Sequence, residues 1–261
     1  MDLIYMRILA IGDVVGSNGC EFLRKKLPLL KRHKAIDFVI ANGENSADGN
    51  GMTKFSYTHL LMSGVDFVTT GNHVYRRREM YDVLEESLSV IRPANYGDDC
   101  PGEGFRIVDI GRLRIAVINM MGVVFMDPLE NPFACIDRIL EKLDGIKIRL
   151  VDFHAEATAE KRAFAFYLDG KVSAVFGTHT HVQTSDDQIL PNGTGYITDL
   201  GMTGPYHSVL GVTPEKAIAR MRTNMPVRFD TANCESYMCG CIFDIDEKTG
   251  RTVEVERIEV F

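Results

Sequence analysis

Five short apolar runs of the sequence are each followed, within a few residues, by a side chain that can bind a metal ion. The segments are RILAIGD, FVIANGEN, FVTTGNH, IRLVDFHAE and AVFGTHTH, and they supply Asp13, Glu44, Asn45, Asn72, His73, His154, His179 and His181. Two carboxylates, two amides and four imidazoles offer oxygen and nitrogen donors to two divalent transition ions, with a carboxylate bridging the pair. The pattern predicts a dinuclear metal site that needs no thiolate.

Each motif also has an ordinary structural explanation when it is taken alone. Gly12-Asp13 suits a turn or a helix cap, and a lone His154 is more often a hydrogen-bonded core histidine than a ligand. We expect His179 and His181 to reach one cluster only from a loop or a strand end, and not from the middle of an extended strand. The recurrence of such side chains after all five runs favours the metal site.

Glycines accompany most of these side chains. A glycine directly precedes Asp13, Glu44 and Asn72, and Gly177 lies two residues before His179. Glycine suits a tight turn in which the backbone swings a short side chain toward a ligand. We therefore expect these glycines to occupy turns.

The apolar runs alternate with amphipathic segments, which indicates parallel strands connected by helices. Helices are expected at Gly19 to Arg32, Lys54 to Ser63, Glu79 to Ser87, Pro132 to Leu143 and Ala157 to Leu168. In open α/β sheets, ligands bind beyond the carboxyl ends of the strands. Candidate ligands that are far apart in the sequence can therefore converge at one edge.

Three hairpins interrupt this alternation. They are expected at Phe105 to Ile110 with Leu113 to Met120, at Gln188 to Leu190 with Tyr196 to Thr198, and at Tyr237 to Asp244 with Thr252 to Val260. Paired runs of this kind around a Gly-containing turn add antiparallel strands. The whole predicts an α/β protein with two mixed sheets packed face to face, helices outside, and a single domain over residues 1–261.

Composition narrows the classes of function. The chain has 261 residues, with 29 Lys and Arg against 36 Asp and Glu and a formal charge of -7. This balance argues against a broad basic surface for duplex nucleic acid. No run is long and apolar enough to span a membrane, and the N-terminus lacks a secretory signal pattern. We therefore expect a cytoplasmic protein without a membrane partner.

The six cysteines are interpreted as free thiols. Cys20, Cys100 and Cys135 are far apart in the chain, which does not suggest a disulfide framework. Cys234, Cys239 and Cys241 could hold zinc, but their C-x4-C-x-C spacing lacks the usual C-x2-C pairs. Buried strand cysteines are the favoured interpretation of this trio.

The motifs together resemble those of the calcineurin-like metallophosphoesterases. The matching segments are Gly12-Asp13, Gly43-Glu44-Asn45, Gly71-Asn72-His73, His154 and Gly177-Thr178-His179-Thr180-His181. Three departures are visible: Val15 replaces a usual histidine, Glu44 replaces a usual aspartate, and Thr178 is an extra residue. These departures, with ANGENSA and TDLGMTGP (Thr198 to Pro205), resemble the YmdB-like branch of bacterial cyclic-nucleotide phosphodiesterases.

The resemblance implies a four-layer α/β/β/α sandwich and two divalent metal ions, with iron or manganese favoured and zinc open. Carried over by position, Asp13, Glu44, Asn45 and His181 would surround the first metal, and Glu44, Asn72, His154 and His179 the second. Glu44 would bridge, and Asn45 would fill the place left by Val15. His73 matches the catalytic histidine. A homo-oligomer, either a dimer or a tetramer, is also implied.

The implied reaction is hydrolysis of 2′,3′-cyclic or 3′,5′-cyclic nucleotides by a hydroxide that bridges the two metals, with His73 protonating the leaving group. Fold and metals do not fix the substrate, so two alternatives stay open. One is a phosphomonoesterase or nucleotidase on the same scaffold. The other is an RNA-associated regulatory metalloprotein with little catalysis.

Residues that bind the substrate are not identified by these motifs. Arg76, Arg77 and Arg78 suit a solvated helix start, although one of them could contact a phosphate or RNA. The segment Gly201 to Pro205 suits either a phosphate-binding turn or a surface loop. Residues 1–5 precede the expected start of the fold and are interpreted as an N-terminal extension.

Overall fold

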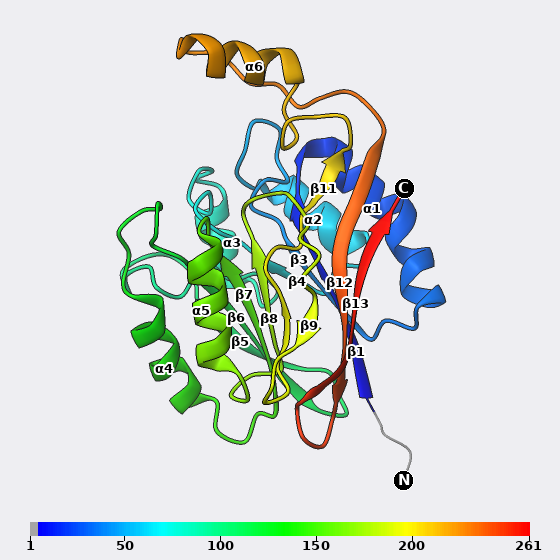
Figure 1. Ribbon diagram of the computed structural model, residues 1–261, viewed down its shortest axis with the longest axis vertical. Coiled ribbons are helices and arrows are strands. Elements are labelled where there is room, and N and C mark those ends of the chain that lie inside the picture. The colour runs from blue at the N-terminus through cyan, green and yellow to red at the C-terminus, as the bar shows by residue number, and fades with distance from the viewer. Residues whose placement is uncertain (1–4) are drawn as a thin grey trace.

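Two mixed β-sheets lie face to face, with helices on both outer faces (Figure 1). The structure is a computed structural model, and it describes residues 5–261. The expected N-terminal extension is thus represented only by Tyr5, which is the first residue of a strand, and residues 1–4 lie outside the described part.

The first sheet has seven strands in the order β2-β11-β12-β1-β3-β4, with β13 also paired to β12. Its strands are β1 (Tyr5–Ile11), β2 (Asp13–Val14), β3 (Phe38–Asn42), β4 (Phe67–Thr69), β11 (Met202–Pro205), β12 (Ser236–Asp246) and β13 (Thr252–Val260). The strands β1, β3 and β4 run parallel, whereas β12 is antiparallel to β1, β11 and β13.

The second sheet has six strands in the order β5-β6-β7-β8-β10-β9. Its strands are β5 (Phe105–Asp109), β6 (Arg114–Met121), β7 (Ile148–His154), β8 (Ala174–Thr178), β9 (Gln188–Ile189) and β10 (Gly195–Ile197). The four central strands are parallel, and an antiparallel strand closes each edge. Two of the expected hairpins, β5 with β6 and β9 with β10, are therefore confirmed in this sheet, and the third, β12 with β13, is confirmed in the first sheet.

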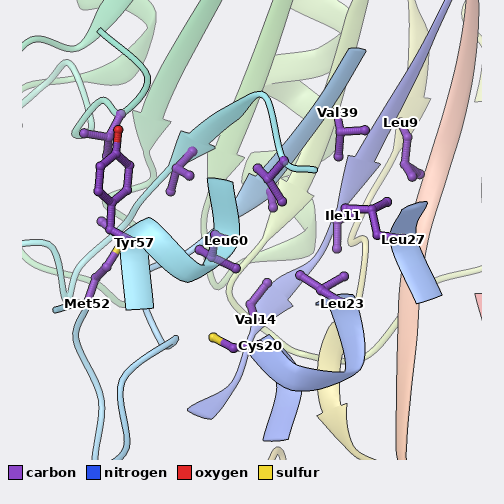
Figure 2. Close-up of a cluster of buried hydrophobic side chains, with 14 of the residues drawn as sticks. Leu9, Ile11, Val14, Cys20, Leu23, Leu27, Val39, Met52, Tyr57 and Leu60 are labelled. Atoms are coloured by element: carbon purple, nitrogen blue, oxygen red, sulfur yellow. The ribbon is translucent and has the colours of Figure 1, made fainter. Parts of the chain in front are cut away.

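Three apolar clusters hold the layers together. The middle cluster lies between the sheets, where Ile8 and Phe67 of the first sheet meet Val117, Leu150 and Phe176 of the second. A second cluster joins the first sheet to α1 (Gly16–His33), α2 (Lys54–Met62) and α3 (Met80–Glu86), and Figure 2 shows part of it. A third joins the second sheet to α4 (Pro132–Lys142) and α5 (Thr158–Leu168). The predicted four-layer α/β/β/α sandwich is confirmed.

The helix α1 illustrates how the sequence encodes this packing. Cys20, Leu23 and Leu27 are spaced by three and four residues, so they share one face, and all three are buried. Lys31, Arg32 and His33 occupy the last turn, where positive charge is stabilised by the helix dipole. The expected helix at Gly19 to Arg32 is confirmed, although it starts three residues earlier.

The segment from Gly201 to Pro205 differs from both expectations for it. Met202–Pro205 form the strand β11, which is buried and pairs with β12 and β2, so this segment is not a surface loop. The helix α6 (Pro214–Thr223) was not expected from the sequence. Figure 1 shows α6 projecting from the sandwich. Of its residues, only Ala217 is buried.

Two further expectations concern the cysteines and membrane-spanning segments. Cys239 and Cys241 lie buried on β12 as interpreted, whereas Cys234 lies before that strand and is partly exposed. No helix within residues 5–261 is long and apolar enough to cross a bilayer.

Candidate metal centre

The candidate ligands lie at the carboxyl ends of strands from both sheets. Asp13 begins β2 directly after β1, Glu44 and Asn45 follow β3, Asn72 and His73 follow β4, His154 ends β7, and His179 and His181 follow β8. The parallel pairing of β1, β3 and β4 and of β7 and β8 brings these ends to one edge of the sandwich. The convergence expected from the strand pattern is present.

Glu44, His154 and His179 form one group of donors, whose ligand atoms all lie within 4.8 Å of one another. Oε1 of Glu44 lies 3.1 Å from Nε2 of His154, and Nδ1 of His179 lies 3.1 Å from the same Nε2. Oδ1 of Asn72 lies 2.9 Å from Nε2 of His154. Four potential ligand atoms therefore face one small volume.

Asp13, Asn45 and His181 form a second group. Nε2 of His181 lies 3.5 Å from Oδ1 of Asp13 and 3.2 Å from Nδ2 of Asn45. The other ring nitrogen of His181, Nδ1, lies 3.1 Å from the carbonyl oxygen of Leu210. Because Nδ1 donates to that carbonyl, Nε2 is the ring nitrogen that faces Asp13 and that a metal ion would take.

The ring of His154 is oriented by a hydrogen bond in a similar way, here to Thr178 at the end of β8. Thr178 donates its hydroxyl proton to Asp152, with 2.6 Å between Oγ1 and Oδ1. Oγ1 of Thr178 is then free to accept from Nδ1 of His154, which lies 2.9 Å away. Nε2 of His154 therefore faces Glu44 as the candidate ligand atom.

The residues present fit a metal ion. Oε1 of Glu44 is buried and has no hydrogen-bond donor of suitable geometry within residues 5–261, which is a costly state for a carboxylate unless a cation lies beside it. Burial alone would raise the pKa of Glu44 and lower that of His154. Their mutual contact overrides both effects, since it lowers the pKa of Glu44 and raises that of His154 to about 9. Positive charge is stabilised at this point.

Asp13 carries a negative charge at the base of the second group. Burial would raise the pKa of its carboxyl, but His181 holds that pKa well below its ordinary value. The carboxylate also accepts a hydrogen bond from the backbone N–H of His179, with 3.0 Å from N to Oδ2. Asp13 therefore contacts both histidines of the Gly-Thr-His-Thr-His motif, one by its backbone and one by its side chain.

His73 lies between the two groups without joining either. Its Nδ1 is 2.9 Å from Oδ1 of Asn45 and 3.4 Å from Oε1 of Glu44. Burial lowers the pKa of His73 more than the nearby Glu44 raises it. The position of His73 suits a group that exchanges a proton beside the candidate metal ligands.

Gly43 and Gly71 each begin a hydrogen-bonded turn as expected, since their carbonyl oxygens accept from the N–H of Ser46 and of Val74. What requires glycine at these motifs, however, is close approach and not a positive φ. Gly12, Gly71 and Gly177 all have negative φ. A Cβ at Gly12 would lie 2.0 Å from the carbonyl oxygen of Gly201, and one at Gly71 would lie 2.3 Å from Nε2 of His154. A Cβ at Gly177 would lie 1.8 Å from the carbonyl oxygen of Thr198. Glycine is the residue that lets these segments touch.

The left-handed backbone lies instead at the histidines, where φ is 102° for His179 and 64° for His181. Such conformations cost free energy in residues other than glycine and persist only where the surroundings impose them. A buried ion pair lies against this segment: Nζ of Lys161 is 2.6 Å from Oδ2 of Asp199. The same Oδ2 accepts from the backbone N–H of Thr180, between the two histidines.

Several supporting residues were missed by sequence reasoning. Asp152 could have been found, because it stands out as a carboxylate in an apolar strand and lies on the same face as His154, two residues on. Lys161 gave no signal, since a lysine in an amphipathic helix is normally solvated. Glu156, whose Oε2 lies 3.1 Å from Nε2 of His179, gave none either.

Among the three consecutive arginines, only Arg77 lines a cavity of about 1020 Å³ that also reaches Asn45 and His181. Its guanidinium donates to the carbonyl oxygens of Asp48 and Asn50. Arg76 and Arg78 are exposed just before α3. The strand β11 does not line this cavity, although Leu210, beyond its end, does.

Comparison with known proteins identifies the family. The model of the YmdB-like proteins matches residues 9–258. The chain belongs to the YmdB-like family. It is 46% identical to the 2′,3′-cyclic-nucleotide 2′-phosphodiesterase of Bacillus subtilis (strain 168), over 97% of this chain and 96% of the relative.

Two solved structures extend the comparison for this YmdB-like chain. A protein from Thermus thermophilus is 43% identical with a TM-score of 0.92, covering 97% of this chain and 98% of that one. A phosphatase from Mycoplasma pneumoniae is 32% identical with a TM-score of 0.94, covering 99% and 94%. The family that the motifs indicated is thus confirmed, and the similarity extends over nearly the whole chain.

Proposed function

We propose that this protein is a metal-dependent phosphodiesterase that hydrolyses cyclic nucleotides, with 2′,3′-cyclic nucleotides as the first candidates. The observation that carries the proposal is that Glu44, His154 and His179 converge, and that Oε1 of Glu44 is buried without a hydrogen-bond donor of suitable geometry among residues 5–261. The name of the Bacillus subtilis relative supports the choice of substrate.

The two groups of donors suggest how two ions would be held. Asp13 and His181 would bind one ion, and Asn72, His154 and His179 the other, with Glu44 between them. Asn45 would join the first ion by turning toward it the amide oxygen that here faces His73. Nitrogen and oxygen donors without thiolate suit manganese, iron or zinc, and we propose manganese or iron. Elemental analysis of protein purified without added metal tests this; fewer than two ions per chain at saturation would refute the dinuclear assignment.

The ions, when bound, would lower the pKa of a water molecule and neutralise the charge that develops on the phosphoryl oxygens. His73 would then protonate the departing alkoxide oxygen, which is otherwise a poor leaving group. Oδ1 of Asn45 can accept a hydrogen bond from Nδ1–H of His73, which leaves Nε2 to serve the substrate. Because burial lowers the pKa of His73, the negative phosphate has to favour its protonated form upon binding.

A phosphomonoesterase or nucleotidase activity is the second candidate, favoured by the description of the Mycoplasma pneumoniae relative as a phosphatase. A panel of 2′,3′-cyclic AMP, 3′,5′-cyclic AMP, 5′-AMP and p-nitrophenyl phosphate, assayed with metal-replete protein, separates the two. We expect the highest kcat/KM on a cyclic nucleotide. A clear preference for the monoesters would replace the diesterase proposal. Inactivity on every compound, with RNA still bound, would favour the regulatory RNA-associated alternative.

Two features bear on the setting of the protein. Its six cysteines are all free, and four of them are buried, which suits a reducing compartment such as the cytoplasm.

The projecting helix α6 exposes Ile218 and Met221, and Met225 follows it. We propose that these apolar side chains are covered in a homo-oligomer, which light scattering of the purified protein would test.

A further inference from the structure

The cavity of about 1020 Å³ begins at the metal centre and extends well beyond it. Asn45 and His181 form its inner wall, and the segment that returns from α6, residues 228–233, forms the outer wall. Sites for single small molecules occupy roughly 300–1,000 Å³. A cyclic mononucleotide with its phosphate at the metals would therefore leave much of this cavity empty.

The returning segment is fixed to the body of the protein by its backbone. Thr231 pairs with Val212 in an antiparallel bridge, and the N–H of Ala232 donates to the carbonyl oxygen of Gly211. The carboxylate of Asp230 is paired with Lys216 at the start of α6. The outer wall is thus held in place where the chain comes back from the projecting helix.

The cavity wall carries two guanidinium groups and two carboxylates. Within residues 5–261, neither Arg77 nor Arg228 makes an ion pair, and both line the cavity. Of the two acidic lining residues, Asp230 is paired with Lys216, so the positive charges of Arg77, Arg228 and Lys216 outnumber the negative charges of Asp48 and Asp230. Guanidinium groups without a carboxylate partner suit a ligand that carries phosphate away from the metals.

The remaining lining side chains suit a nucleoside. Asn18, Asn50 and Asn233 offer amide donors and acceptors, and Phe229 is the single aromatic residue of the lining. Phe229 is 47% exposed, so part of its side chain is open to contact with a base. Single-stranded nucleic acids are bound through such combinations of aromatic platforms, amides and cationic side chains.

We infer that the substrate is the 3′ end of a single-stranded RNA that carries a 2′,3′-cyclic phosphate. The cyclic phosphate lies at the metals, the preceding phosphodiester lies against Arg228 and Arg77, and a base stacks on Phe229. A mononucleotide has one phosphate and cannot occupy both the metals and the arginines. The formal charge of -7 for the whole chain is consistent with recognition of an RNA end inside a local cavity and not of a duplex. This inference rests on the proposed diesterase function.

The test compares two substrates of the same chemistry. The kcat/KM of metal-replete protein is measured on 2′,3′-cyclic AMP and on a short oligoadenylate that ends in a 2′,3′-cyclic phosphate. We expect the oligonucleotide to be favoured by roughly tenfold or more, which is the scale of one charge-assisted hydrogen bond. Arg228→Met should remove most of that advantage and leave the mononucleotide rate unchanged. Phe229→Ala should lower kcat/KM for the oligonucleotide by roughly tenfold, the scale of one stacked base.

Arg222→Met is the matched control for Arg228→Met, because Arg222 is exposed on α6 and does not line the cavity. Binding of the labelled oligonucleotide to metal-free protein gives a readout independent of turnover. That binding should weaken in Arg228→Met and should also lose part of its salt dependence. Equal kcat/KM on both substrates, or an effect of Arg222→Met as large as that of Arg228→Met, would overturn the inference. Absence of hydrolysis of either substrate would instead overturn the proposed function.

Discussion

Asp199→Asn should destabilise the protein more than any exposed carboxylate change, because it breaks the buried ion pair with Lys161. Both side chains are only 1% exposed. Removing one partner of a buried pair leaves the other charge uncompensated, which costs about 3–5 kcal/mol. Lys161 would keep the carbonyl oxygen of Thr178, 2.9 Å from its Nζ, and a neutral amide oxygen in place of the carboxylate. The free energy of unfolding should fall by that amount.

The assay is urea and thermal unfolding of metal-free wild type and variant, so that metal binding does not contribute. For a chain of this size, a loss of 3–5 kcal/mol corresponds to a fall in Tm of roughly 6–20 °C. Glu130→Gln is the matched control. Glu130 pairs with Arg138 at 2.6 Å, but the two side chains are 41% and 56% exposed, so its loss should cost less than about 1 kcal/mol.

A second variant separates the charge effect from the positioning effect. Lys161→Met together with Asp199→Asn removes both charges, so stability should recover toward the wild-type value. Metal content should not recover. Asp199 accepts the backbone N–H groups of Thr180 and Gly201 on its two oxygens, and an asparagine offers only one oxygen. If Asp199→Asn unfolds within about 1 kcal/mol of wild type, or if the double variant regains full metal content, this reasoning is wrong.

Four further outcomes are expected. His73→Ala should keep both metals but lose roughly a hundredfold or more in rate on bis-p-nitrophenyl phosphate, as for a general acid; an unchanged rate would remove His73 from the mechanism. Gly71→Ala should lower metal content, because its Cβ would lie 2.3 Å from the ring of His154; normal metal content would contradict this. In native protein at pH 8, a thiol reagent should modify Cys100 and Cys234 first, since the other four cysteines are buried. Metal-free protein should unfold in one transition by circular dichroism and tyrosine fluorescence, as expected for one domain over residues 1–261, and two separate transitions would argue for two units.

The layers of the fold could be predicted because burial follows the local sequence pattern. Apolar runs of strand length and amphipathic runs of helix length alternate, and the expected helices appear with small shifts of their ends. The two strands that were missed lack such a pattern. The strand β2 has two residues, and β11 has the sequence MTGP, which contains glycine and proline. Their extended form comes from pairing with each other and with β12 rather than from local preference.

The candidate ligands could be predicted because their chemistry is local to each strand end. The residues that orient them could not, because orientation depends on contacts between distant segments. Thr178 fixes His154 only because Asp152 accepts its proton, and Leu210 fixes His181 from a loop far along the chain. Spacing alone does not reveal either contact.

The two histidines of the Gly-Thr-His-Thr-His motif show where this limit lies. Alternation along a strand predicts that residues two apart share a face, and yet His179 faces Glu44 and His154 while His181 faces Asp13. The difference arises because both residues adopt positive φ after β8 ends, so the strand rule no longer applies to them. This conformation is held by hydrogen bonds that the segment's own backbone donates, from Thr180 to Asp199 and from His179 to Asp13. The motif therefore supplies the ligand atoms, whereas buried carboxylates elsewhere in the chain decide which donor group each histidine joins.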